Sequence, residues 1–216
     1  MISEELNCIF VHIPKTGGTS IENAIWGPDW SQRTEEQLWM GNVRPGFNKY
    51  QSGGLQHLLA TQIRKEVGEQ KFDSCFRFTF VRNPWDKAVS QYCYIKSRPM
   101  LLKHMGLSRW SSFGRYLKVI SQDHEKHVQS FEQCKFIFDD QGNRLVDYVG
   151  RFETLAQDFR VVADKIGLPN LKLPHDMKSA RRQHYSKYYN AKRADVISKV
   201  YARDIETFGY EFQAAS

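Results

Sequence analysis

The sequence predicts a single α/β domain, residues 1–216, with a mainly parallel sheet flanked by helices. Short apolar runs typical of buried strands occur at residues 9–13 and 76–81, and each is followed closely by a segment whose apolar residues recur at helical spacing. Strands that alternate with helices in this way lie parallel in one sheet. The 41% hydrophobic content fits one compact core in a chain of 216 residues.

The first strand leads into a glycine-bearing loop and a helix, in the stretch CIFVHIPKTGGTSIENAIW at residues 8–26. Pro14 ends the strand, and Gly17 and Gly18 let the backbone turn sharply. The first amides of a helix have no internal partner, and the helix dipole favours negative charge there. We therefore predict a phosphate-binding loop that carries Lys15, Thr16, Thr19 and Ser20.

The order of residues in this loop excludes two common nucleotide motifs. In the nucleoside-triphosphatase pattern G-x-x-x-x-G-K-[ST] the lysine follows the last glycine, whereas Lys15 precedes Gly17 and Gly18. The dinucleotide pattern G-x-G-x-x-G is absent as well. The residues of this loop alone do not exclude an alternative interpretation, in which the glycines form a plain turn and the lysine is solvated.

A second strand and helix follow at residues 76–95, FRFTFVRNPWDKAVSQYCYI. Asn83 is a good helix N-cap and Pro84 suits the first helical position. Arg82 then stands at the carboxyl end of a strand, the edge where open α/β sheets bind ligands, with Ser90 about two turns further on. Arginine and serine donors suit a phosphate. The alternative is an ion pair between Arg82 and Asp86, with Ser90 on the surface.

His57 is the candidate general base. We expect a helix from His57 to Gly68, with His57 at its N-terminal end, where the positive dipole disfavours imidazolium. A histidine that merely caps or packs on its helix is the alternative interpretation.

The remaining elements are predicted from apolar spacing and turn signals. A long polar loop is expected at 27–54, followed by a helix at 108–122 with Trp110, Phe113, Leu117 and Ile120 on one side. Residues 136–138 and 145–149 are expected to form a hairpin around DDQGN. Two more helices are expected, one at 154–166 with a Thr154/Gln157 capping box and one at 195–208.

The net charge of +7 implies anionic partners such as a nucleotide, nucleic acid, acidic glycan or membrane surface. No apolar run is long enough to cross a bilayer, and the first strand begins too close to Met1 to leave room for a signal peptide, so we expect a cytoplasmic protein. The four cysteines show neither C-x-x-C pairing nor zinc spacing, and we expect reduced, mostly buried thiols.

The motifs PKTGGTS and FVRNPWDKAVS resemble those of the carbohydrate-type sulfotransferases, which include relatives of heparan sulfate 2-O-sulfotransferase. The segments VGRFETLAQDF and YARDIETFGY are similar to that family as well. The resemblance implies a P-loop-like three-layer fold that binds 3′-phosphoadenosine-5′-phosphosulfate (PAPS) and releases PAP. The absence of a transmembrane anchor is typical of a soluble, bacterial-type member rather than a Golgi enzyme.

The resemblance also implies roles for individual residues. The 5′-phosphosulfate would be held by Lys15, Thr16, Gly17, Gly18, Thr19 and Ser20, and the 3′-phosphate by Arg82 and Ser90. His57 matches the position of the family's base. The basic, aromatic stretch 172–189 resembles the loop that closes over the nucleotide, where Lys178, Ser179, Arg181 and Arg182 would contact the 3′-phosphate and Tyr185 or Tyr188 the adenine.

These roles predict transfer of a sulfuryl group from PAPS to an acceptor hydroxyl, expected on a carbohydrate or glycoconjugate. His57 would act as base, Lys15 would stabilise the leaving phosphate, and no metal is required. The alternatives are a P-loop-like kinase, a nucleic-acid-binding protein that uses the basic excess, and an inactive nucleotide-binding relative. A kinase is disfavoured by the missing G-K-[ST], and a nucleic-acid binder leaves the two phosphate motifs unexplained.

Overall fold

A computed structural model describes residues 1–27, 57–174 and 183–214. The chain forms two compact units, which are described separately below. The first consists of Met1–Val81 and Lys135–Met177, and the second of Arg82–Cys134 and Lys178–Ser216. The long loop predicted at 27–54 falls almost wholly outside the described residues.

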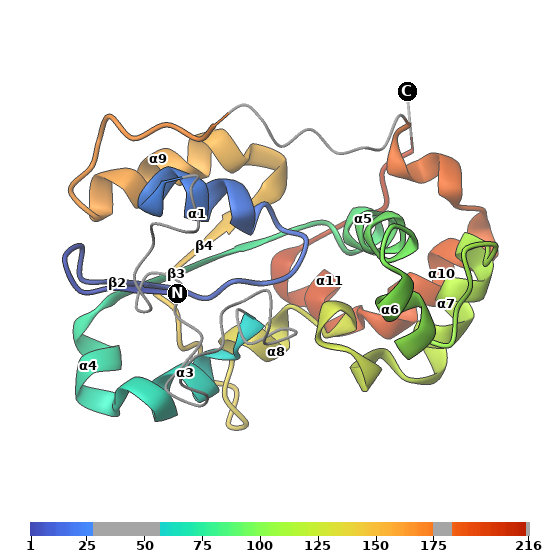
Figure 1. Ribbon diagram of the computed structural model, residues 1–216, viewed down its shortest axis with the longest axis horizontal. Helices are drawn as coiled ribbons and strands as arrows, with labels where there is room; N and C mark the ends of the chain where they lie inside the picture. The colour runs from blue at the N-terminus through green and yellow to red at the C-terminus, as the bar shows by residue number, and fades with distance from the viewer. Residues whose placement is uncertain (28–56, 175–182, 215–216) are drawn as a thin grey trace. The chain divides into compact units, whose positions relative to one another are not determined.

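The first unit contains a four-stranded sheet in the order β1-β2-β3-β4 (Figure 1). Its strands are β1 (Ile2–Ser3), β2 (Cys8–Phe10), β3 (Phe76–Val81) and β4 (Tyr148–Arg151). The β1–β2 pairing is antiparallel, whereas β2–β3 and β3–β4 are parallel. The prediction of a mixed α/β unit with a mainly parallel sheet is therefore confirmed.

Helices flank this sheet. They are α1 (Gly18–Trp26), α3 (Ala60–Val67), α4 (Glu69–Ser74), the short α8 (Cys134–Ile137), the 3₁₀ turn η5 (Phe152–Thr154) and α9 (Leu155–Lys165). On β2 and β3 every second side chain points to the same face, and α1 and α9 cover that face. The resulting core consists of Cys8, Phe10, Ile21, Phe78, Phe80, Phe159, Val162, Ala163 and Ile166.

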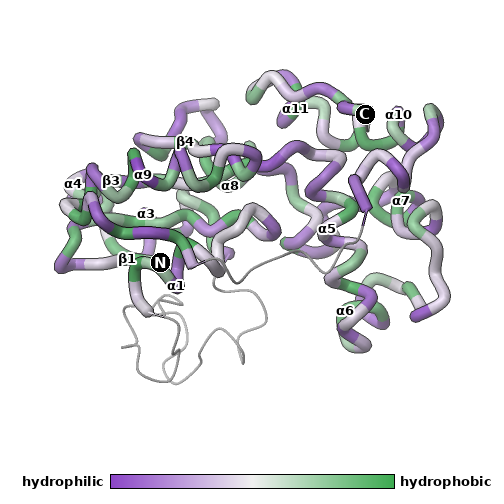
Figure 2. The backbone as a smooth tube through the Cα atoms, turned by 90° about the horizontal axis from the view of Figure 1, so that it is seen from above, coloured by the Kyte–Doolittle hydropathy of each residue, from purple (hydrophilic) through white to green (hydrophobic). Residues whose placement is uncertain are grey.

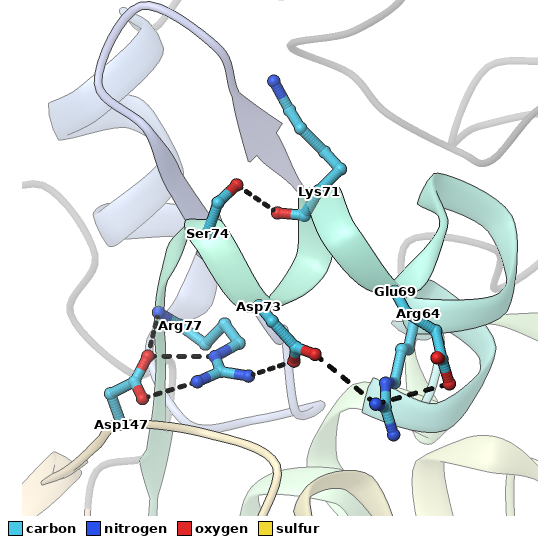
Figure 3. A network of polar contacts seen from close by, with 7 residues as sticks. All are labelled: Arg64, Glu69, Lys71, Asp73, Ser74, Arg77 and Asp147. Carbon is cyan, nitrogen blue, oxygen red and sulfur yellow. Dashed lines mark hydrogen bonds and ion pairs between the residues drawn. The ribbon is translucent and has the colours of Figure 1, made fainter.

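A polar network joins the start of β3 to the start of β4 (Figure 3). The Arg77 guanidinium donates to both carboxylate oxygens of Asp147, at 3.0 and 2.8 Å, and to Asp73 of α4 at 2.9 Å. Arg64 of α3 reaches Asp73 and Glu69, at 3.4 and 3.3 Å. The hydrogen bonds that Arg77 donates to Asp147 raise the pKa of Arg77. This network fixes the end of the sheet opposite the carboxyl ends of β2 and β3.

The second unit is helical in its described part. Its elements are α5 (Pro84–Lys96), α6 (Pro99–His104), α7 (Phe113–Gln122), η3 (His124–Lys126), η4 (Val128–Ser130), η6 (Tyr185–Tyr188), α10 (Ala191–Val200) and α11 (Ala202–Phe208). Asn83 caps α5 as predicted, because its side chain accepts a bond from the Trp85 amide and Pro84 occupies the first turn. Aromatic rings hold the unit together, as in the contacts of Phe113 with Tyr92 and Tyr189 at 5.3 and 5.1 Å.

A fully buried carboxylate organises the chain before α8. Asp204 of α11 accepts bonds from the amides of Gln133 and Cys134, each at 2.8 Å. The Gln133 side chain in turn accepts from the Arg82 amide at 2.8 Å and donates to the Arg82 carbonyl at 2.9 Å. Buried polar groups that are satisfied in this way fix the backbone at Arg82.

Two predicted helices differ from those observed. The helix expected at 108–122 begins only at Phe113, because Ser112 caps it by accepting a bond from the Arg115 amide. Trp110 thus lies outside the helix and is 82% exposed. The helix expected at 195–208 starts earlier and is divided at Tyr201, whose hydroxyl donates to the buried Ser130 carbonyl.

The predicted hairpin and capping box are also corrected. Phe136 and Ile137 belong to the helical turn α8, only a single bridge joins Phe138 to Arg144, and the following strand pairs with β3 instead. At the start of α9 the Thr154 hydroxyl donates to Asp158 and Thr154 accepts no capping bond, so the predicted capping box of Thr154 and Gln157 does not form.

The four cysteines are free thiols, and Cys8, Cys75 and Cys134 are buried, as predicted. Hydrophilic and hydrophobic stretches are intermixed along the described backbone (Figure 2). Within the described ranges, no helix combines the length and the apolar character that crossing a membrane requires.

Candidate active site

The loop between β2 and α1 has an unusual backbone conformation at Lys15. This residue has a φ of 67°, in the left-handed region that non-glycine residues seldom adopt. Such backbone strain persists only where the surrounding structure enforces it, and it concentrates at functional sites. The loop follows the carboxyl end of a parallel strand, which is the edge where ligands bind in open α/β sheets.

The next residues form the start of α1. Gly17, at the N-cap, has a φ of 88° and offers no side chain to the amides of the first turn. The Thr16 hydroxyl donates to the Ile13 carbonyl at 2.9 Å, so this donor stabilises the loop itself. An uncapped helix start beside a lysine suits an anion.

Both glycines are required by the packing around them. A Cβ atom at Gly17 would lie 2.9 Å from a methyl carbon of Leu155 in α9. At Gly18 it would lie 2.0 Å from Nε2 of His12, so the ring of His12 fills the place of a side chain. The loop therefore packs directly against the imidazole of His12 and against α9.

His57 lies before α3 rather than at its first turn, because the helix begins at Ala60 with Leu59 as its cap. The expectation of a helix starting at His57 is therefore wrong by three residues. The orientation of His57 comes instead from a bond of 2.9 Å between its Nδ1 and the His12 carbonyl. Since a carbonyl only accepts, Nδ1 carries the proton and the neutral ring has its lone pair on Nε2. That tautomer is the one a base requires.

His12 and Glu22 were missed by the motif analysis. His12 Nδ1 lies 2.7 Å from a carboxylate oxygen of Glu22, and both side chains are buried. The His12 ring also meets the His57 ring edge-on, with centroids 4.5 Å apart. One sequence signal was available, because Glu22 adjoins the apolar face of α1 formed by Ile21 and Ile25.

Arg82 and Ser90 belong to the second unit. The Arg82 guanidinium is buried and bonds one carboxylate oxygen of Asp86 through Nε and Nη2, at 2.8 and 2.7 Å. This ion pair is the alternative that the sequence left open. Ser90 lies in the middle of α5 and is partly exposed. Their proposed contact with a 3′-phosphate stays a prediction.

The stretch 172–189 is described only in part. Lys178, Ser179, Arg181 and Arg182 lie outside the described residues. Tyr185 is buried, and its hydroxyl accepts a bond from the Gln213 amide at 2.8 Å. Among the described residues, no group of three His, Cys, Asp or Glu side chains is arranged to hold a metal ion.

The fold and the loop define an α/β protein with an uncapped helix start that suits an anion, beside a pair of histidines. Comparison with known proteins gives the family. The model described as "Sulfotransferase family" matches residues 1–211, and the chain therefore belongs to the sulfotransferase family. This membership supports sulfuryl transfer as the class of reaction.

An uncharacterized protein of Archaeoglobus fulgidus is 32% identical over 132 residues, which cover 59% of this chain and 97% of that protein. No solved structure matches the chain.

Proposed function

We propose that the protein transfers a sulfuryl group from PAPS to an acceptor hydroxyl by in-line displacement. The hydroxyl oxygen forms a bond to sulfur while the bond from sulfur to the 5′-phosphate oxygen breaks. The products are a sulfate ester and PAP, and the hydroxyl proton passes to His57. The acceptor hydroxyl belongs to a carbohydrate or glycoconjugate in this proposal.

The observation that carries the proposal is the loop from His12 to Ser20. Lys15 is held in a left-handed conformation immediately before the uncapped start of α1. A lysine at that place suits the negative charge that grows on the leaving phosphate oxygen, and helix amides suit the oxygens of the transferred group. Thr19 and Ser20, in the first turn of α1, supply further donors for the same oxygens.

His57 is the proposed general base. The bond from its Nδ1 to the His12 carbonyl orients the ring, and in the neutral tautomer the lone pair that would accept the hydroxyl proton lies on Nε2. His57→Ala is expected to lower turnover ~10²–10⁴-fold, because that is the usual contribution of a proton-transfer group. PAP should bind this variant with unchanged affinity. Near-normal turnover would remove His57 from the mechanism.

The 3′-phosphate is assigned to Arg82 and Ser90, and to Lys178, Ser179 and Arg181 in the stretch outside the described residues. The support for this part is the resemblance of FVRNPWDKAVS to the second nucleotide motif of the family. Ser90→Ala tests it without disturbing a buried group, because Ser90 is partly exposed whereas Arg82 is buried in an ion pair. Weaker binding of PAP but unchanged binding of adenosine 5′-phosphosulfate, which lacks the 3′-phosphate, is the expected result.

The donor is tested by thermal unfolding with PAP, with ATP and Mg²⁺, and with an oligonucleotide. A ligand at ~100 times its dissociation constant stabilises the folded protein by ~2.7 kcal/mol. We expect the melting temperature to rise with PAP and not with the other two ligands. A rise with ATP and Mg²⁺ would favour a kinase, and a rise with the oligonucleotide alone would favour a nucleic-acid binder. Transfer of labelled sulfate to a panel of saccharides, lipids and small alcohols then identifies the acceptor.

A further inference from the structure

The helical unit carries a long stretch of chain with charges of one sign. From Lys87 to Gln122 the sequence contains basic residues but neither Asp nor Glu. The exposed cations of this stretch are Lys96, Arg98, Lys103, Arg109, Arg115 and Lys118. A surface segment of one sign attracts anionic partners and repels cationic ones.

Two large apolar side chains lie among these cations. Met100 is 87% exposed and Trp110 is 82% exposed, whereas Val161, the next large hydrophobic residue among those described, is 41% exposed. A single exposed apolar residue is ordinary, because much of any protein surface is apolar. Two nearly fully exposed ones in one basic stretch are typical of an interaction site.

The short helix α6 directs Met100 outward. Leu102 and Met105 are buried and hold one side of the helix against the unit. At 3.6 residues per turn, Met100 lies on the opposite side. Lys103 and His104 follow it by three and four residues, so they share its face, and both are exposed.

Trp110 projects from a tight turn that is fixed at both ends. The Ser111 amide donates to the Ser108 carbonyl at 3.0 Å, and the Ser108 amide donates to the Ser111 hydroxyl at 3.0 Å. The Tyr92 hydroxyl anchors the turn to α5 by donating to the Ser111 carbonyl at 2.9 Å. The Arg109 guanidinium lies over the indole, 4.8 Å from its centroid. The indole is therefore presented to solvent together with a cation.

The two apolar side chains belong to one part of the surface. The Leu107 amide donates to the Leu102 carbonyl at 2.8 Å, so the chain turns back beside α6. Trp110 follows Leu107 closely, and Met100 precedes Leu102 closely, so their backbones lie within about 20 Å of each other. We call Met100, Lys103, Arg109 and Trp110 the α6 surface.

We propose that the α6 surface binds the protein peripherally to an anionic lipid bilayer. Trp110 and Met100 enter the interface, and Lys103 and Arg109 lie against the headgroups. Tryptophan favours the level of the headgroups, and Lys and Arg near a bilayer are attracted by anionic lipids. Interfacial binding combines apolar burial with this attraction. The proposal does not depend on the proposed sulfuryl transfer.

Other occupants fit the α6 surface less well. A second copy of the chain would bring two surfaces of the same charge together, which is repulsive. A polyanion such as heparin or an oligonucleotide satisfies the cations and can stack on Trp110, but it offers no apolar phase to Met100. A bilayer with anionic headgroups accommodates both the cations and the apolar side chains.

The first test is co-sedimentation of the full chain with vesicles of equimolar phosphatidylglycerol and phosphatidylcholine. We expect binding that weakens as salt is added, and no binding to vesicles of phosphatidylcholine alone. Tryptophan emission should shift to shorter wavelength on binding, and Trp110→Phe should remove the shift. Failure of the wild-type protein to bind the anionic vesicles, or binding without a shift, would overturn the proposal.

The second test compares two double variants. Trp110→Ser with Lys103→Gln removes one apolar side chain and one cation from the α6 surface. Val161→Ser with Lys165→Gln does the same on α9 in the first unit, also at exposed positions. Because all four side chains are exposed, both variants should melt as the wild type does.

The partition coefficient of the first variant should fall about fiftyfold, about fivefold from the cation and about tenfold from the apolar side chain. The α9 variant should bind vesicles as the wild type does. An equal loss in both variants would overturn the proposal. Binding of heparin or of an oligonucleotide by a wild-type protein that does not bind the vesicles would overturn it as well and would assign the α6 surface to a polyanion.

The outcomes separate this proposal from the proposed function. If PAP fails to stabilise the protein but the vesicles bind it through the α6 surface, the sulfotransferase mechanism fails and membrane binding stands. If PAP stabilises the protein and the vesicles do not bind it, the mechanism stands and membrane binding falls.

Discussion

A methyl group at Gly18 is expected to damage both the loop and the histidine pair. In Gly18→Ala the new Cβ would lie 2.0, 2.2 and 2.7 Å from three atoms of the His12 ring, so the ring or the loop must move. The ring has little freedom, because Glu22 holds it at 2.7 Å and Phe10 stacks on it at 5.3 Å.

The size of the effect follows from three contributions. Overpacking of a filled interior costs about 1–3 kcal/mol. Breaking the hydrogen bond to a charged Glu22 costs a further ~1.5–3 kcal/mol, and replacing a helical glycine by alanine returns about 1 kcal/mol. We therefore expect Gly18→Ala to lower the free energy of unfolding by about 1.5–5 kcal/mol, measured by urea denaturation.

Gly114→Ala is the matched control. Gly114 is also a helical glycine, but a Cβ there would be 3.5 Å from the Arg193 side chain, an ordinary contact. This variant should be more stable than the wild type by about 0.5–1 kcal/mol. If Gly18→Ala were as stable as Gly114→Ala, the close approach of His12 to the loop would be refuted.

Three further predictions concern other positions. Lys15→Gly relieves the left-handed strain of the backbone. Its free energy of unfolding, measured by urea denaturation, should equal that of the wild type or exceed it by about 1 kcal/mol, whereas calorimetry should show weaker binding of PAP. Asp204→Ala leaves the amides of Gln133 and Cys134 without their acceptor and should cost about 3 kcal/mol, whereas the exposed Asp195→Ala should cost under about 0.5 kcal/mol in the same assay. Burial lowers the pKa of Lys87 from 10.5 to about 8, so the unfolded chain holds the extra proton between these pH values. Wild-type stability relative to Lys87→Met should thus rise by about 3 kcal/mol from pH 8 to above 10.5, and a constant difference would contradict the shift.

The strands and helices nearest the proposed site were predictable because local signals agree there. The apolar runs before Pro14 and Arg82 form parallel strands, and Asn83 with Pro84 starts α5. Elsewhere local side-chain bonds displaced the expected pattern. Ser112 caps α7 where a start at Ser108 was expected, and the Thr154 hydroxyl donates to Asp158 where a capping box with Gln157 was expected. Such side-chain bonds depend on backbone geometry that apolar spacing does not encode.

The sequence by itself determined the class of fold and the glycine loop after the first strand. Local spacing suffices for these features, because helix starts and strand ends are made by neighbouring residues. Only the tertiary structure decided that the His12 ring lies against Gly18, that Glu22 contacts His12, and that the His12 carbonyl fixes the tautomer of His57. The last of these contacts joins residues 45 positions apart through packing, which no local pattern specifies.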